Sequence, residues 1–174
     1  MMRPQFGPAS PMYDAERLRE IADLGLLDER VDEVLSEIAR EAAARLDLPI
    51  SLVSVVLDEA QHLAASHGVS GWIGEAGGTP AEWSFCAHSV HSRDAFVVEN
   101  AATHPLMKEN PLVTEDGIRC YAGIPLISSR GFVLGNLCVI GAEERTFGAD
   151  EMELLRELAA RAVARIEERR APAS

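Results

Sequence analysis

The run Tyr121-Ala122-Gly123-Ile124-Pro125-Leu126-Ile127 is apolar and has the length of one strand. It is followed by Ser128-Ser129-Arg130-Gly131 and then by a second apolar run, from Phe132 to Ile140. A short polar segment that ends in glycine, placed between two such runs, is typical of a β-hairpin. The sequence therefore predicts two neighbouring antiparallel strands over residues 121–127 and 132–140.

Periodicity on either side of this hairpin completes an α+β pattern. Apolar residues recur at helical spacing from Asp14 to Gly25, from Val31 to Leu46 and from Gly148 to Arg169. Runs rich in β-branched residues predict strands over residues 50–57 and 96–98, and residues 61–66 are expected to pair back as a strand after a turn at Asp58-Glu59-Ala60. Helices at both ends of the chain and strands between them predict helices packed on one face of an antiparallel sheet.

The other face of the predicted sheet needs a cover. The stretch from Gly68 to Asp116 is the only segment long enough to supply one, and it includes a short helix over residues 85–90 and a helical turn near Met107. We expect a small-molecule site between this cover and the sheet.

Composition restricts the classes of partner. The formal net charge is −12 and the isoelectric point is near 4.8, which argues against nucleic acid and against anionic membrane surfaces. The sequence shows no apolar stretch of transmembrane length and no signal peptide, so we expect a cytoplasmic protein. We expect a flexible tail over residues 1–12, one domain over residues 13–170 and a short tail over residues 171–174.

Five short motifs resemble, in the same order, those of the GAF sensory domain. They are Leu24-Gly25-Leu26-Leu27-Asp28, Ser84-Phe85-Cys86-Ala87-His88, Asn110-Pro111-Leu112-Val113, Tyr121-Ala122-Gly123 with Pro125-Leu126, and Gly135 with Leu137-Cys138. The subtype is the one found at the N-terminus of bacterial sensor kinases and cyclic-dinucleotide enzymes. The resemblance implies a sheet of about six strands, similar to PAS domains, with terminal helices that form a dimer bundle. It also implies a stand-alone, non-catalytic sensory domain that binds a small molecule and signals to a separate partner.

Several charged positions of this subtype are replaced. The Phe-Lys-Ser segment of relatives corresponds to Leu63-Ala64-Ala65-Ser66-His67, and an arginine corresponds to Ala81. An aspartate corresponds to Asn100, and Asp-x-Arg-Phe corresponds to His104-Pro105-Leu106-Met107. These differences remove charge from the rim of the predicted pocket, and no particular ligand or cofactor is predicted.

The predicted ligand-binding residues come from the motifs and from strand alternation. Arg119 and Tyr121 would share one face of a strand and present a guanidinium and a phenol to the same ligand. The alternative is an arginine paired with a surface acid and a tyrosine at the sheet edge. The full predicted set is Phe85, Cys86, His88, Asn110, Arg119, Tyr121 and Gly123.

Three other functions remain open from the sequence. Cys86, His88 and His91 have spacing that could hold a metal ion or haem, although a fourth ligand is not adjacent. Cys86, Cys120 and Cys138 could support a redox sensor or an enzyme similar to free methionine sulfoxide reductase, if two sulfurs lie within disulfide reach. The apolar stripes of the end helices could also serve a pure dimerisation module, and a homodimer is expected.

Overall fold

A computed structural model describes residues 14–26, 33–56, 61–68, 89–90, 92–105, 107–109, 111–114 and 118–168. The expected tails over residues 1–12 and 171–174 lie outside these residues. No helix in the described part of the chain combines the length and the apolar character needed to cross a membrane.

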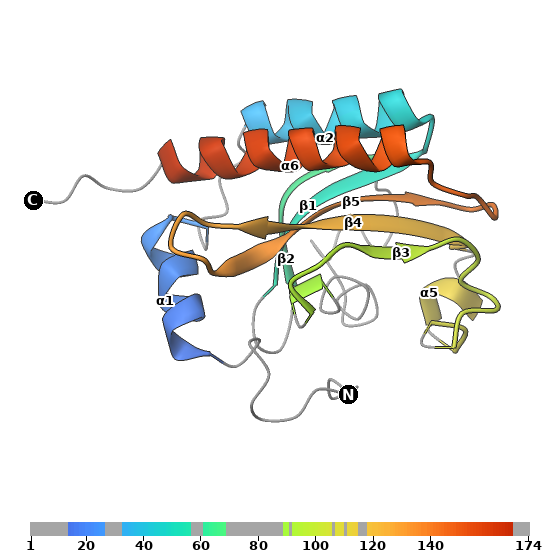
Figure 1. Ribbon diagram of the computed structural model, residues 1–174, viewed down its shortest axis with the longest axis horizontal. Helices are drawn as coiled ribbons and strands as arrows, with labels where there is room; N and C mark the ends of the chain where they lie inside the picture. Colours follow the sequence, from blue (N-terminus) through green and yellow to red (C-terminus); the bar gives the residue numbers. More distant parts are fainter. Residues whose placement is uncertain are drawn as a thin grey trace, which may run out of the picture.

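One antiparallel sheet forms the centre of the molecule (Figure 1). Its strands are β1 (Ile50–Val56), β2 (Gln61–His67), β3 (Phe96–Val98), β4 (Cys120–Ile127) and β5 (Val133–Gly141), in the order β2-β1-β5-β4-β3. The predicted hairpin is confirmed, because β4 pairs with β5 from Cys120–Gly141 to Ile127–Val133. The described residues contain five strands of the six that the resemblance implied.

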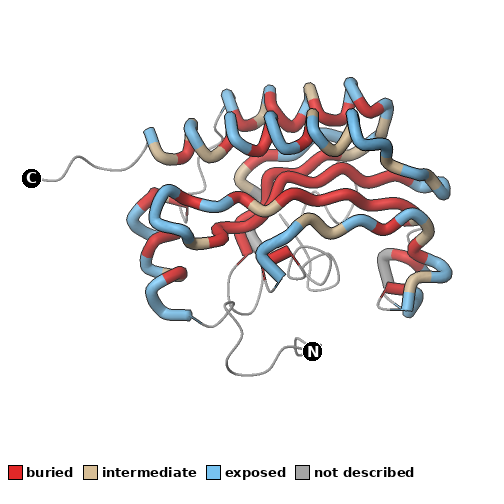
Figure 2. Tube along the Cα trace, viewed as in Figure 1, coloured by how far each residue is buried: buried red, intermediate tan, exposed pale blue. Residues whose placement is uncertain are grey.

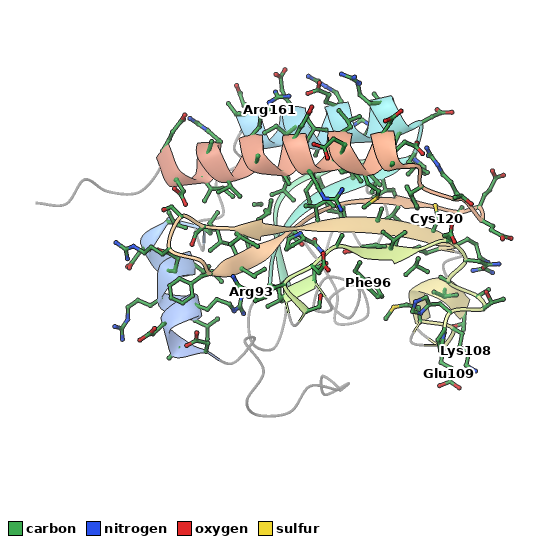
Figure 3. All side chains as sticks on the ribbon, viewed as in Figure 1. Arg93, Phe96, Lys108, Glu109, Cys120 and Arg161 are labelled. Atoms are coloured by element: carbon green, nitrogen blue, oxygen red, sulfur yellow. The ribbon has the colours of Figure 1, made fainter. Side chains whose placement is uncertain are left out.

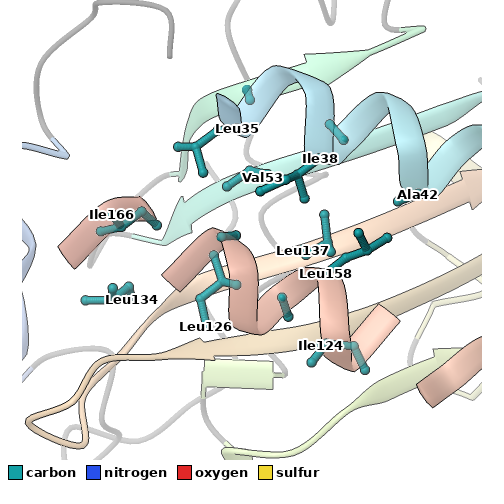
Figure 4. Packing of buried hydrophobic residues seen from close by; sticks show 14 of the residues in the cluster. Leu35, Ile38, Ala42, Val53, Ile124, Leu126, Leu134, Leu137, Leu158 and Ile166 are labelled. Carbon is teal, nitrogen blue, oxygen red and sulfur yellow. The ribbon is translucent and has the colours of Figure 1, made fainter. Parts of the chain in front are cut away.

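Two long helices, α2 (Glu33–Leu46) and α6 (Ala149–Glu168), lie side by side over one face of the sheet (Figure 1). Their inward residues pack on alternate strand residues such as Val53, Ile124 and Leu137, and Figure 4 shows this core. The pattern follows from the two periods, since helix positions three and four apart meet strand positions two apart. The predicted α+β class is therefore confirmed.

The first helix, α1 (Ala15–Asp23), has a different position. It lies at the end of the sheet beside the β4–β5 turn, rather than next to α2 and α6 (Figure 1). Asp14 begins it, because its carboxylate accepts a hydrogen bond from the Glu16 N–H at 3.0 Å. Its buried residue Ile21 nevertheless belongs to the same core cluster as the inward residues of α2 and α6.

The opposite face of the sheet, which we call the distal face, carries a second apolar cluster. Leu52, Tyr121, Cys138 and Ile140 belong to it, and all four are buried, as the red strands of Figure 2 show. The residues that cover them come from the segment after β3, which includes the short helix α5 (Pro111–Thr114): Ala101, Met107, Val113 and Ile118. The predicted cover therefore exists in its second half, while residues 69–88 are not described.

Candidate functional site

Three polar side chains form a hydrogen-bonded chain across the distal face. Ser54 of β1 donates from Oγ to Asn136 Oδ1 at 2.7 Å, and Asn136 of β5 donates from Nδ2 to Tyr121 OH of β4 at 2.6 Å. Ser54 and Asn136 are fully buried and Tyr121 is 1% exposed. Buried polar groups in an apolar layer fix one geometry, because leaving any of them without a partner is costly.

Strand pairing explains why these residues meet. Ser54 is directly opposite Asn136 in the β1–β5 ladder, so their side chains leave the same face of the sheet. Tyr121 lies further along β4, and its ring reaches back over Gly123. A Cβ at Gly123 would lie 2.6 Å from Tyr121 OH and 3.0 Å from Asn136 Nδ2. The glycine is therefore required for the phenol to reach the amide.

The direction of the hydrogen bonds gives the chain a polarity. Ser54 is the donor to Asn136, and Asn136 is the donor to the phenol oxygen. The phenol oxygen of Tyr121 is therefore the last acceptor of this chain.

Aromatic side chains lie beside the phenol. The Phe96 ring is 5.9 Å from the Tyr121 ring and 5.7 Å from the His104 ring, centroid to centroid, with the second pair edge to face. Figure 3 shows Phe96 below the sheet on the distal side. Burial lowers the pKa of His104 below its ordinary value of 6.5, which favours the neutral imidazole at pH 7. The lowered pKa therefore disfavours a charge on the imidazole beside Phe96.

The predicted site residues are only partly placed. Tyr121 and Gly123 lie together on the distal face. Phe85, Cys86, His88 and Asn110 lie outside the described residues, and so does His91 of the possible metal site. Within the described ranges, no three His, Cys, Asp or Glu side chains are grouped so that they could hold a metal ion.

Arg119 binds the backbone of the segment that covers the distal face. Its guanidinium donates to the carbonyl of Val113 in α5 and to that of Ile118, both at 2.9 Å. Among the described residues it has no ion pair with an acid, and its contact with a ligand beside Tyr121 stays a prediction. Tyr121 is also not at the sheet edge, because β3 pairs outside β4.

The two described cysteines lie on opposite faces of the sheet. Cys138 pairs with Gly123 and lies on the distal face. Cys120 pairs with Gly141, and its sulfur lies on the other face, where Leu48 also approaches Gly141. Both are buried and neither is in a disulfide. Because alternate strand residues point apart, Cys120 and Cys138 cannot form a redox pair in this fold. Cys86 lies outside the described residues.

Sequence reasoning missed Ser54 and Asn136 as site residues. The available signal was Asn136 itself, a lone amide inside the apolar run from Val133 to Ile140. A polar residue at such a position needs a buried partner. The sequence could not name that partner, since Ser54 is 82 positions away and pairs with it only through the ladder.

A cleft lies elsewhere, at the end of the sheet where α6 begins. Its volume is about 510 Å³, and its lining comes from two segments, Leu46–Pro49 and Gly141–Arg145. Arg145 donates to the Leu46 carbonyl and pairs with Glu151, so its guanidinium ties the end of α2 to the start of α6. These contacts give the cleft a structural explanation, and it is separate from the distal face.

Comparison with known proteins identifies the family. The profile of the GAF domain matches residues 28–167. The chain belongs to the GAF domain family. It is 37% identical, over 139 residues, to a cyclic di-GMP phosphodiesterase of Pseudomonas aeruginosa; the match covers 79% of this chain and 23% of that protein. This GAF domain therefore spans less than a quarter of the length of that curated relative.

Solved structures support the same fold. The GAF domain of a phosphoenolpyruvate-protein phosphotransferase from Acinetobacter aligns with a TM-score of 0.61 at 17% identity, covering 89% of this chain and 95% of that one. Free methionine-R-sulfoxide reductase from Neisseria meningitidis, in complex with its substrate, aligns with a TM-score of 0.63 at 18% identity, covering 98% of each chain. At these identities the likeness shows the fold alone.

Proposed function

We propose that this GAF domain is a non-catalytic sensor that binds a small molecule on the distal face and relays its presence through its terminal helices to a separate protein. The observation that carries the proposal is the buried chain Ser54–Asn136–Tyr121. Small-molecule sites combine an apolar lining with a few fixed polar groups. The distal face has both, and it is the face that the long helices leave uncovered (Figure 1).

The ligand in this proposal is a largely apolar or aromatic molecule. It packs beside the Tyr121 ring, near Phe96 and His104. Ser89, which directly follows the predicted Phe85–His88 segment, is a further buried polar residue. Its hydroxyl is fully buried and has no hydrogen-bond partner among the described residues. Phe85, Cys86, His88 and Asn110 remain proposed contacts from the covering segment.

The relay would use the helices that contact the sheet. A ligand that binds one arrangement of the cover more tightly than another shifts the population of the two arrangements. Helices α2 and α6 pack on the opposite face of the same strands, so a shift in β4 or β5 reaches them directly. The homodimer expected from these helices stays a proposal. On their outer side Arg161 pairs with Glu41 of the same chain at 2.9 Å (Figure 3).

Native mass spectrometry of freshly purified protein tests the binding proposal and reports the oligomeric state. We expect a small-molecule adduct on the wild type that is reduced or absent in Tyr121→Phe, which keeps the ring and removes the hydroxyl. Ser51→Ala is the matched control, because it removes a buried hydroxyl from the helix-covered side of β1. An adduct that survives Tyr121→Phe unchanged would contradict the proposed site.

Two activity assays test the non-catalytic part. The purified chain is incubated with cyclic di-GMP and, separately, with free methionine-R-sulfoxide plus a thiol reductant, and the products are separated by chromatography. We expect both compounds to remain unchanged. Turnover of either one would overturn the non-catalytic assignment, while leaving the adduct experiment to decide the binding site.

A further inference from the structure

The turn between β4 and β5 contacts both ends of the domain. Gly131 N–H donates to the Ser128 carbonyl at 2.8 Å, which closes a turn over Ser128–Gly131, and Ser128 N–H donates to the Phe132 carbonyl at 2.8 Å. Gly131 has a φ of +86°, a conformation that glycine adopts without strain. The turn is therefore a fixed structure that continues directly from the two strands carrying Tyr121 and Asn136.

On one side the turn binds α1. The Ser128 hydroxyl donates to Glu20 Oε2 at 3.0 Å, and both residues are almost fully buried. The same hydroxyl oxygen accepts from the Phe132 N–H at 3.3 Å. The Ser128 hydroxyl has a single hydrogen, and it is donated to Glu20. This hydrogen bond links the position of α1 to the position of the turn.

A second buried residue of α1 reinforces this contact. Arg17 is 1% exposed, and its Nη1 donates to the carbonyl of Val56 at 2.7 Å and to that of Val133 at 3.0 Å. These carbonyls stand at the end of β1 and the start of β5, just beyond the last paired residues, Val55 and Gly135. Arg17 therefore spans the point where the two strands separate. Any change in that separation alters its two hydrogen bonds.

On its other side the turn binds the end of α6. The Ser129 N–H donates to Glu167 Oε1 in the last turn of this helix. Ser128 and Ser129 are adjacent, so one peptide unit separates the contact to α1 from the contact to α6. Figure 1 shows α1 and the C-terminal end of α6 at the same end of the sheet, beside this turn.

From these contacts we infer that the Ser128–Gly131 turn is a junction that couples the docking of α1 to the order of the last turn of α6. A displacement of the hairpin changes the Ser128–Glu20 and Ser129–Glu167 hydrogen bonds together, because Ser128 and Ser129 lie in one closed turn. The N-terminal helix and the C-terminal helix therefore respond as one unit. The use of this coupling for signalling rests on the proposed function, whereas the coupling itself needs no ligand.

Hydrogen exchange of the full chain tests the inference. Ser129→Pro removes the donor to Glu167, and proline suits the second position of such a turn. Glu167→Ala removes the same hydrogen bond from the helix side. We expect amides in residues 163–168 to exchange about two- to tenfold faster in both variants, the range that one hydrogen bond supplies. We also expect amides of α1, which neither variant touches, to exchange at least about twofold faster.

The reverse variant and a control complete the test. Coupling is reciprocal, so Ser128→Ala, which removes the contact to Glu20, should speed exchange in α1 and also in residues 163–168. Arg161→Gln breaks the pair with Glu41 in the middle of α6 and leaves the turn intact; it should not change α1. If each variant speeds amide exchange only in the helix that it touches, the junction is overturned. It is also overturned if Arg161→Gln speeds amide exchange in α1 as much as the turn variants do. Neither outcome depends on whether a ligand adduct is found.

Discussion

Replacing Tyr121 by Phe removes one oxygen from the buried chain and leaves the aromatic ring in place. The lost atom is the acceptor for Asn136 Nδ2, which lies 2.6 Å away and is shielded from water. A buried donor left without its acceptor costs about 1–3 kcal/mol. We expect the free energy of unfolding to fall by that amount, and the melting temperature to fall by about 2–4 °C for each kcal/mol.

Urea unfolding of four proteins measures this effect and shows whether the chain acts as a unit. The proteins are the wild type, Tyr121→Phe, Ser54→Ala and the double variant. Ser54 and Tyr121 interact through Asn136, so their effects should differ from additivity by about 0.5 kcal/mol or more. A parallel cycle with Ser51→Ala, on the other side of the sheet, should be additive. A Tyr121→Phe protein as stable as the wild type, with additive effects in the first cycle, would refute the reasoning.

Three further outcomes follow from single residues. Gly123→Ala places a methyl group 2.6 Å from the Tyr121 oxygen, so it should cost about 1–3 kcal/mol in urea unfolding, and less in a Tyr121→Phe background; an equal cost in both would contradict the contact. Burial lowers the pKa of His104 in the fold, so the unfolded chain takes up a proton first as the pH falls below about 6.5, and stability declines there. Urea unfolding between pH 5 and 8 should show that the free energy of unfolding falls less with decreasing pH in His104→Gln than in the wild type. An equal fall in both proteins would mean that other groups cause the pH dependence. Burial raises the pKa of the Cys120 thiol, so Ellman's reagent at pH 8 should modify it only after unfolding; rapid labelling of the native protein, located by peptide mapping, would show an open site.

Local patterns predicted most of the fold because each element repeats its own period. The helices α2 and α6 and the strands β1, β4 and β5 lie within a few residues of their expected bounds. The segment from Ser128 to Gly131 predicted the hairpin through its turn chemistry, since glycine adopts the positive φ found at Gly131 without strain. What the patterns could not give was the position of α1, which depends on Arg17 and Glu20 finding partners more than 35 residues away.

The candidate site shows the same division more sharply. The motifs led to the prediction of Tyr121 and Gly123, and the structure places the two residues together on the distal face. Alternation alone could not show that the Arg119 guanidinium binds carbonyls of Val113 and Ile118. Ser54 and Asn136 entered the site only through the pairing of β1 with β5.

The sequence by itself determined the α+β class and the element order, because these depend on hydrophobic period and turn chemistry that are local to each segment. The family followed from the resemblance of its motifs. Tertiary structure alone decided which polar groups meet. Ser54, Asn136 and Tyr121 come from three strands, and Glu20, Ser129 and Glu167 come from two helices and a turn. The physical reason is that a buried hydrogen bond requires a definite distance and direction between two atoms. Only strand register and helix packing bring atoms so far apart in the sequence into that geometry.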